Sequence, residues 1–194
     1  MHKPEIEVKI SVSSPAAGRK RIRDAGFRVH VPRVFEVNIL WDTSDHRLRA
    51  QGKLVRLRDA GGHSILTFKG KSMNARHKVR EEVETRVENA GAVERVFREI
   101  DLAPVFRYEK YRTEYSGTEA HGVVTLDETP IGTFLEIEGP ARWIDRTAKQ
   151  LGFSPADYIT ASYGALYLQY CGARGIQPTN MVFRGKSGTD YSHG

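Results

Sequence analysis

The sequence predicts an α+β protein built on an antiparallel β-sheet, and three observations lead to this class. Short segments with alternating polar and apolar residues recur along the chain, beginning with Glu5-Ile6-Glu7-Val8-Lys9, as expected for strands. Several of these segments are joined by links of hairpin length, which connect antiparallel neighbours. Segments with a helical spacing of apolar residues stand near the beginning, middle and end of the chain, and not after every strand.

The expected elements follow in the order strand, helix, several strands, helix, strands and two helices. The first helix is predicted from its ends, because Ser14 is a plausible N-cap, Pro15 suits the first helical position and Gly26 ends the segment. The remaining elements are expected as strands at 33–42, 53–59, 63–70, 78–87, 106–116, 121–127 and 132–138, a polar loop at 71–77, and helices at 89–101, 140–151 and 154–170.

Length and composition indicate one folded domain. The chain has 194 residues, enough for a substantial core. We expect a single domain over residues 1–171 and a flexible C-terminal tail over 172–194, either loose or laid on the surface, because that segment is rich in glycine and lacks apolar periodicity.

Charge and cysteine content limit the environment and the partners. The formal net charge of +6 favours anionic partners, whether phosphorylated small molecules, nucleic acid or acidic lipid. Cys171 is the only cysteine, so no internal disulfide can form, and we expect it in the core of a protein from a reducing compartment. No apolar run is long enough to span a membrane, and the N-terminus lacks the apolar stretch of a signal peptide. A cytoplasmic protein is therefore expected.

The predicted strands carry their charges on one parity. The opposite parity is mostly apolar, so each strand has one charged and one apolar face. The charged face holds Glu5, Glu7, Lys9, Arg56, Arg58, Lys69, Arg80, Glu82, Glu84, Lys110, Arg112, Glu114, Asp127, Glu136 and Glu138.

Two architectures account for this pattern. One is an open sheet with a solvated charged face, and the other is a closed barrel with the charges inside and the helices outside. Closure removes exposed sheet edges, and about eight strands leave room for a small ligand. The barrel is favoured because the charged face uses arginine in closely spaced basic pairs. In addition, carboxylates gather on the first and last strands while cations dominate the middle ones.

A barrel with these charges would suit a polyphosphate and a metal ion. Arginine binds phosphate oxygens through a planar fork and lysine through a point charge. Glu5, Glu7, Glu136 and Glu138 have matching spacing on two strands, and grouped carboxylates repel one another unless they are protonated or bridged by cations. Hard oxygen ligands suit Mg²⁺ or Mn²⁺. The seven histidines show no paired ligand spacing, which makes zinc a poor candidate.

These residues, in this order, resemble the CYTH family, also called triphosphate tunnel metalloenzymes. Glu5-Ile6-Glu7-Val8-Lys9 matches the family's E-x-E-x-K signature. The elements that follow match in order, over roughly residues 4 to 170: R-x-R at 56–58, the lysine at 69, R-x-E-x-E at 80–84, K-x-R at 110–112, the aspartate at 127 and E-x-E at 136–138. The resemblance implies a closed eight-stranded antiparallel β-barrel, or tunnel, with helices packed outside.

The resemblance also implies roles for individual residues. The phosphate-binding residues would be Lys9, Arg56, Arg58, Lys69, Arg80, Lys110 and Arg112. Asp127, Glu136 and Glu138 would bind the first metal ion, while Glu5 and Glu7 would bind a second metal ion or the attacking water. Glu82 and Glu84 would either hold cations in place or bind metal through water.

The chain departs from the family in one element. Some members cap the tunnel with a lysine from a late helix, but this chain has no lysine between Lys149 and Lys186. Closure is expected instead from the 71–77 loop with its neighbour Lys78, or from the tail. The basic residues considered for it are Lys71, Arg76, Lys78, Arg174, Arg184 and Lys186.

The family implies an enzyme of one of two kinds. We expect a metal-dependent triphosphatase that hydrolyses the terminal phosphate of inorganic triphosphate or of a small organic triphosphate. The alternative is a class IV adenylyl cyclase, which needs an extra base for the ribose hydroxyl and a place for adenine. Trp41, Phe35 and Tyr108 are the aromatic residues considered for that place, although each is expected to be structural.

A non-catalytic binder of polyphosphate or RNA 5′ ends is a hypothesis of another class. No nucleic-acid partner is expected, because carboxylates and not aromatic residues interleave with the basic residues. The sequence leaves open the choice between monomer and homodimer.

Overall fold

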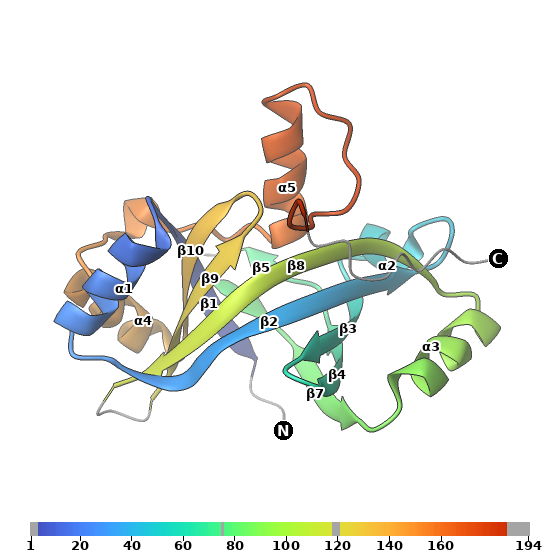
Figure 1. Cartoon of the computed structure of the whole chain (residues 1–194), viewed down its shortest axis with the longest axis horizontal. Helices are drawn as coiled ribbons and strands as arrows, with labels where there is room; N and C mark the ends of the chain where they lie inside the picture. Colours follow the sequence, from blue (N-terminus) through green and yellow to red (C-terminus); the bar gives the residue numbers. More distant parts are fainter. Residues whose placement is uncertain (1–3, 75, 118–120, 186–194) are drawn as a thin grey trace.

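The computed structural model describes residues 4–74, 76–117 and 121–185 (Figure 1). In chain order its elements are β1 (Glu5–Val12), α1 (Pro15–Asp24), β2 (Arg28–Asp42), α2 (Arg47–Ala50), β3 (Leu54–Ala60), β4 (His63–Lys69), β5 (Met73–Asn74), β6 (Lys78–Arg80), β7 (Glu82–Val87), α3 (Ala90–Glu99), β8 (Ala103–Ser116), β9 (Val123–Thr129), β10 (Gly132–Glu138), α4 (Ala141–Gln150), the short 3₁₀ helix η1 (Pro155–Asp157) and α5 (Tyr163–Gly172).

The strands form one antiparallel sheet that curls into a nearly closed barrel. Their order is β5-β6-β1-β10-β9-β8-β2-β3-β4-β7. β6 pairs with β1 and β7 pairs with β4, and only Glu81 separates β6 from β7, so one stretch of chain joins the two ends of the sheet. Counting β6 and β7 as halves of one strand and setting aside the two-residue β5, the described barrel has eight strands, as predicted.

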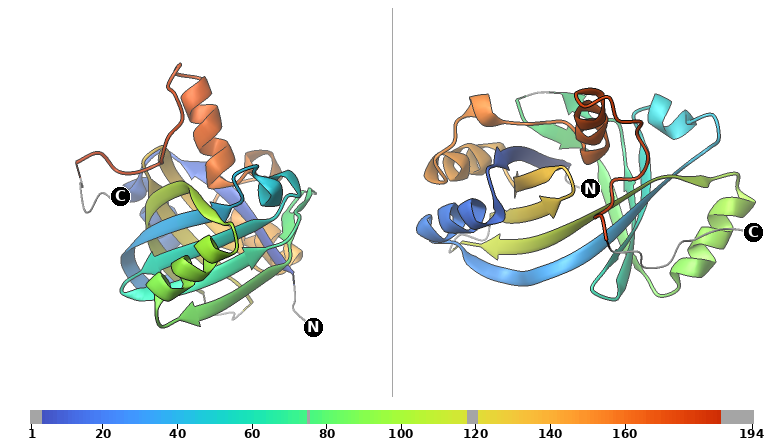
Figure 2. Two further views of the ribbon diagram at one scale, coloured as in Figure 1. Left: turned by 90° about the vertical axis from the view of Figure 1, so that its right-hand side faces the viewer. Right: turned by 45° about the horizontal axis from the view of Figure 1, so that its top comes forward.

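Helices cover the outside of this barrel, which confirms the α+β prediction. Figure 1 shows α1 and α4 together on one side, α3 at the opposite end and α5 projecting from the barrel, and Figure 2 (left) views the barrel from the α3 end. The largest core cluster lies under α1 and α4, where Ile22 and Ile144 contact apolar residues of β1, β9 and β10. The alternating strands thus bury their apolar faces against the helices.

The prediction of one helix over 154–170 is wrong. Asp157 accepts hydrogen bonds from the Ser154 backbone N–H (2.8 Å) and hydroxyl (3.0 Å), and this capping box closes the single turn η1. The chain then runs extended, and Ile159 exchanges two backbone hydrogen bonds with Lys9 of β1. α5 begins only at Tyr163, with Ser162 as its N-cap. Pairing with the barrel strand interrupts the helix between the two caps.

Two other elements differ from expectation. β2 begins at Arg28 and not near residue 33, and its register with β8 shifts twice between Val29 and Val34. Pro32 lies in that stretch and has no N–H for the ladder, so the irregularity conceals the strand's beginning. The 71–77 segment is not entirely loop, since Met73–Asn74 forms β5 beside β6.

The segment after α5 lies along β8. The Met181 N–H donates to the Arg107 carbonyl (3.0 Å), the Glu109 N–H donates to the Met181 carbonyl (2.9 Å), and Met181 is 1% exposed. Residues 186–194 are outside the described part of the chain, so the flexible tail over 172–194 and its boundary at residue 171 stay predictions. Cys171 is buried and free, as predicted. Among the described helices, none combines the length and apolarity needed to cross a membrane.

Candidate functional site

The charged parity of the strands faces the barrel interior. Val8 and Ile10 of β1, Leu126 of β9 and Ile137 of β10 are at most 1% exposed, and they pack in one cluster with Ile22 of α1 outside the barrel. Since successive residues of a strand point to opposite faces, the charged residues between them point inward. The alternation in the sequence therefore identified the lining of the interior.

The acidic pairs of the first and last strands lie side by side. In the register of β1 with β10, Lys9 stands opposite Glu136 and Glu7 opposite Glu138. On the other side of β1, Glu5 stands opposite Arg80 of β6. The four glutamates with matching spacing thus occupy adjacent strands, as a barrel requires.

Ion pairs join most of the interior charges into one unbroken series of alternating sign, which we call the interior ion-pair chain. Seven cations and seven carboxylates take part, and the longest link, from Arg56 Nη2 to Glu82 Oε1, measures 3.8 Å. In order, its members in the described part of the chain are Lys78, Glu7, Lys9, Glu136, Arg112, Asp127, Lys110, Glu36, Arg58, Glu84, Arg56, Glu82, Lys69 and Glu5. Most basic side chains of the interior therefore lie in contact with acidic side chains.

Asp127 lies at the most buried point of this chain, with 0% exposure. Lys110 Nζ donates to its Oδ2 at 2.8 Å, and Arg112 donates to Oδ1 and Oδ2 at 2.8 and 2.6 Å. The Tyr163 hydroxyl adds a further hydrogen bond to Oδ2 at 2.7 Å. Asp127 thus holds two of the predicted phosphate ligands in fixed positions.

Two glutamates beside Lys9 remain ionised in spite of their burial. Burial alone would raise the pKa of Glu136, but Lys9 and Arg112 hold it well below its usual range. Burial also opposes ionisation of Glu7, yet Lys9 and Lys78 lower its pKa to about 2. Both groups are carboxylates across the neutral pH range.

Glu82 and Glu138 behave in the opposite way. The pKa of Glu82 is raised to about 8, mainly by burial and to a smaller extent by a hydrogen bond with Glu5, although Lys69 lies 2.9 Å away. The pKa of Glu138 is raised to about 7, mainly by burial and to a smaller extent by repulsion from Glu5 and Glu7. An additional cation near Glu5, Glu82 and Glu138 would therefore be favourable.

Arg80 is turned toward the barrel wall. Its guanidinium donates to the backbone carbonyls of Gly70 and Gly52, the latter at 3.0 Å. Burial lowers the pKa of Arg80. The structure therefore places Arg80 at the interior but engages it with backbone, unlike the other predicted phosphate ligands.

Several interior residues were missed by sequence reasoning. Glu36 and Asn38 of β2 stand opposite Lys110 and Arg58, so the alternation within 33–42 was a signal that could have revealed them. Tyr163 enters from α5, for which the strand pattern carries no signal.

Some of these groups lack hydrogen-bond partners in the described structure. Both amide atoms of Asn38 are buried and unpaired, and the residue is 0% exposed. Within the described residues, three further interior atoms are buried without a hydrogen-bond partner: Nε of Arg56, Nε of Arg58 and Oγ1 of Thr125. Because unpaired buried polar atoms are costly, these atoms in the barrel wall are suited to hydrogen bonds with water or with a polar ligand.

The donor set fits a hard divalent cation. The acidic members of the interior ion-pair chain are all aspartate or glutamate, whose carboxylate oxygens are the ligands that Mg²⁺ and Mn²⁺ prefer. Among the described residues no three acidic, histidine or cysteine side chains converge on one point, since lysine and arginine hold the carboxylates. Burial raises the pKa values of Glu82 and Glu138, and a divalent cation beside them would favour their ionised forms.

The residues considered for tunnel closure lie in different places. Lys78 points inward and pairs with Glu7. Arg76 lies 3.4 Å from Asp145 of α4, outside the barrel. Arg174 stacks on Tyr170 at 3.9 Å, and Lys186 is outside the described residues. Of the described candidates, Lys78 is the one that the structure joins to the interior charges.

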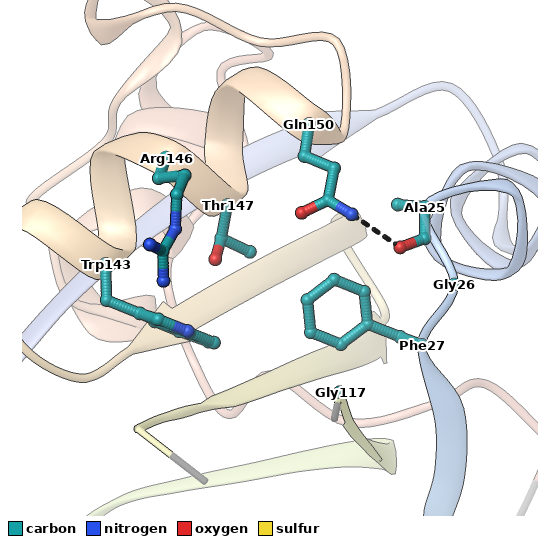
Figure 3. A pocket seen from close by; sticks show the side chains of 8 residues that line it. All are labelled: Ala25, Gly26, Phe27, Gly117, Trp143, Arg146, Thr147 and Gln150. Carbon is teal, nitrogen blue, oxygen red and sulfur yellow. Dashed lines mark hydrogen bonds between the residues drawn. The ribbon is translucent and has the colours of Figure 1, made fainter. Parts of the chain in front are cut away.

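A cavity outside the barrel is separate from these charges. It measures about 240 Å³ and lies between the C-terminal end of α1 and α4. Figure 3 shows Phe27 and Trp143 in its lining, together with the hydrogen bond from Gln150 to the Ala25 carbonyl (2.7 Å). Its lining contains one ionisable side chain, Arg146. This lining therefore offers far fewer charged groups than the barrel interior does.

Known proteins share this architecture. The chain is 25% identical over 134 residues to "Putative adenylate cyclase MJ0240" of Methanocaldococcus jannaschii, covering 69% of this chain and 75% of that protein. The PH1819 protein of Pyrococcus horikoshii has a similar solved structure, with a TM-score of 0.71, 21% identity, and coverage of 85% of this chain and 98% of that one.

A third similar protein is HpAC1 from Hippeastrum, described as a "putative adenylyl cyclase" with a dominant triphosphatase activity. Its TM-score is 0.62 and its identity 20%, over 90% of this chain and 97% of that one. At such identities the solved structures show a shared fold. The CYTH domain model matches residues 3–163, which span nearly all of the barrel and its helices. The chain therefore belongs to the CYTH family.

Proposed function

We propose that this protein is a metal-dependent triphosphatase. It would hydrolyse the terminal phosphate of inorganic triphosphate, or of a small organic triphosphate, inside the barrel with Mg²⁺ or Mn²⁺. The interior ion-pair chain carries the proposal, because it pairs the cations that a triphosphate needs with the carboxylates that a metal ion needs.

The charge balance of the interior couples the binding of triphosphate to the binding of a divalent cation. A triphosphate that takes Lys9, Lys110 and Arg112 as partners separates them from Glu136 and Asp127. The freed carboxylates are then buried without compensation, which is strongly unfavourable. A divalent cation removes this cost, so substrate and metal are expected to bind together.

Each group of residues has a role in this proposal. The phosphate oxygens would be held by Lys9, Arg56, Arg58, Lys69, Lys110 and Arg112, with Arg80 at the edge of the site. Asp127, Glu136 and Glu138 would hold the first metal ion, and Glu5 and Glu7 the attacking water or a second ion. Glu82 and Glu84 would keep Lys69, Arg56 and Arg58 in position.

The chemistry follows from preorganised charge. Bound metal would supply Lewis acidity and neutralise charge at the transferred phosphoryl group. The basic side chains are already fixed by the interior ion-pair chain, so little reorganisation would accompany stabilisation of the transition state. A carboxylate of Glu5 or Glu7 would orient the water toward the terminal phosphorus. The products would be orthophosphate and the shortened phosphate chain.

Adenylyl cyclase activity is the second candidate, because two of the similar proteins carry that name. The aromatic residues considered for adenine stacking are occupied in packing: Trp41 contacts Phe97, Phe35 contacts Tyr111, and Tyr108 stacks on Phe106. Their structural role was expected. These contacts support hydrolysis over cyclisation.

A substrate panel tests the proposal. Purified protein is incubated with inorganic triphosphate, thiamine triphosphate or ATP, each with Mg²⁺, Mn²⁺ or EDTA, and orthophosphate, pyrophosphate and cyclic AMP are measured. We expect metal-dependent orthophosphate release, with a Glu136→Gln variant purified identically as the control for contaminating phosphatases. Dominant cyclic AMP and pyrophosphate from ATP would replace the proposal with the cyclase. Triphosphate binding without any turnover would leave a binding module.

Metal binding is expected to release protons near neutral pH. With pKa values of about 8 and 7, Glu82 and Glu138 retain protons at pH 7 that a nearby cation would displace. Metal affinity should therefore rise between about pH 6 and 8 and level off above that. Because these pKa values lie above those of glutamates in the unfolded chain, protonation of Glu82 and Glu138 stabilises the metal-free fold at low pH. This contribution to the free energy of unfolding is lost as pH rises through 7 to 8.

Calorimetry at pH 7 in two buffers of different ionisation enthalpy measures this release. The apparent binding enthalpy of Mg²⁺ should differ between the buffers by the number of protons released multiplied by the difference between the two ionisation enthalpies. The Glu82→Gln/Glu138→Gln double variant should reduce that difference. Equal enthalpies in both buffers for the unmodified protein would show that these carboxyl groups do not respond to the metal.

A further inference from the structure

The extended segment before α5 brings one side chain of that helix into the barrel. β6 pairs with β1 only from Glu5 to Glu7. Beyond it, Ile159 takes the place beside β1 and exchanges backbone hydrogen bonds of 2.8 and 3.0 Å with Lys9. Three residues later Ser162 caps α5, and Tyr163 is its first residue. Because the backbone is fixed beside β1 just before α5 begins, the Tyr163 side chain points into the barrel interior.

Tyr163 contacts three members of the interior ion-pair chain at once. Its hydroxyl donates to Asp127 Oδ2 at 2.7 Å. Its ring centroid lies 5.1 Å from Lys9 Nζ and 5.3 Å from Lys110 Nζ, within the range of cation–π contacts. Tyr163 is 7% exposed. One aromatic residue therefore touches two candidate phosphate-binding lysines and the aspartate that pairs with one of them.

The ring of Tyr163 also packs against other aromatic rings. Phe134 of β10 meets it edge-on at 5.7 Å between centroids, and Tyr108 of β8 lies at 6.1 Å. These residues belong to a cluster with Tyr167, Cys171 and Met181, which fills the space under α5. Tyr163 thus lies between the interior charges and an aromatic wall under α5.

Tyr167 provides a comparison within the same helix. It lies one turn after Tyr163 and is similarly buried, at 8% exposed. Its hydroxyl donates to the Asn180 carbonyl (3.2 Å) and accepts from the Thr179 N–H (3.3 Å), so it holds the segment after α5 and not the interior charges. Comparing substitutions of Tyr163 and Tyr167 therefore distinguishes an effect on the interior charges from an effect on the packing of α5.

We propose that Tyr163 is a positioning residue of the active site. Its ring directs the ammonium groups of Lys9 and Lys110 toward one phosphate, its hydroxyl holds Asp127 against Lys110, and its aromatic wall ends the phosphate-binding path. Tyr163 would thereby do with an aromatic ring what a late-helix cation would do by charge. The inference rests on the proposed function for its kinetic readout, but its binding readout is independent of turnover.

Substitution of the two tyrosines tests this role. Tyr163→Phe keeps the ring and loses the hydrogen bond to a charged acceptor, so kcat should fall about 10- to 100-fold with KM nearly unchanged. Tyr163→Leu also loses the ring, so triphosphate binding measured in EDTA should weaken about tenfold. Tyr167→Phe should retain the kcat and KM of the unmodified protein. Thermal unfolding of each variant is recorded alongside.

The outcomes are distinct. A kcat of Tyr163→Phe equal to that of the unmodified protein, or equal losses for Tyr163→Phe and Tyr167→Phe with equal falls in Tm, would overturn the inference. If the unmodified protein turns over no triphosphate, the proposed function fails. In that case the EDTA binding series still decides the role of Tyr163, since unchanged binding by Tyr163→Leu would overturn it.

Discussion

Glu136→Gln is expected to lower kcat by about 100- to 1,000-fold while retaining triphosphate binding in EDTA. Glu136 is buried between Lys9 (2.9 Å) and Arg112. Glutamine has the same shape, but it lacks the charge that a hard cation needs from a ligand. The substitution also removes one of the two carboxylates that each of Lys9 and Arg112 contacts, which leaves both cations more available for phosphate. Steady-state kinetics and calorimetry in EDTA measure the two effects separately.

The matched control is Glu128→Gln on the neighbouring strand β9. Glu128 pairs with Arg33 (3.0 Å) and Arg19 (3.3 Å), which belong to the outside of the barrel. Its removal should change kcat by less than about twofold, because exposed ion pairs contribute little. A Glu136→Gln enzyme with the activity of Glu128→Gln would exclude Glu136 from catalysis.

The barrel interior could be predicted because its pattern is local. The inward face of a strand can be recognised from that strand's own sequence, as in β10, where Glu136 and Glu138 alternate with the apolar Leu135 and Ile137. The order of charged elements then indicated which strands share the site. Burial and register confirm this arrangement. The roles of the individual residues stay predictions.

The missed features depend on tertiary contacts. Ser154-Pro155 and Ser162 are both good helix starts, and only the pairing of Ile159 with Lys9 decides that the long helix begins at the second. Tyr163 reaches the site through that pairing, so no periodicity within α5 marks it. The division of the 78–87 strand at Glu81 likewise reflects its two partners, β1 and β4.

Net charge proved a less direct guide than pattern. The chain has a formal excess of six basic residues, but the interior ion-pair chain holds equal numbers of basic and acidic residues. The basic excess is therefore located elsewhere in the chain. What prepares the interior for a polyanion is not surplus charge but the pairing of each basic group with a carboxylate that a metal ion could take over.

Metal dependence of triphosphate binding is the second large effect expected. In EDTA the anion must compete with the carboxylates that hold Lys9, Lys110 and Arg112. With Mg²⁺ those carboxylates gain a new partner, so we expect affinity to rise by about 100-fold or more, a coupling of about 2.7 kcal/mol. The effect should be reciprocal, with triphosphate strengthening metal binding.

The most direct test of this account compares that enhancement between two proteins. Triphosphate affinity is measured by calorimetry in EDTA and in Mg²⁺ for the unmodified protein and for Glu136→Gln under identical solutions, so that metal–triphosphate complexes formed in solution contribute equally to both. We predict a large enhancement in the unmodified protein and one at least tenfold smaller in Glu136→Gln. Equal enhancements would contradict the claim that the interior carboxylates couple the metal ion to the triphosphate.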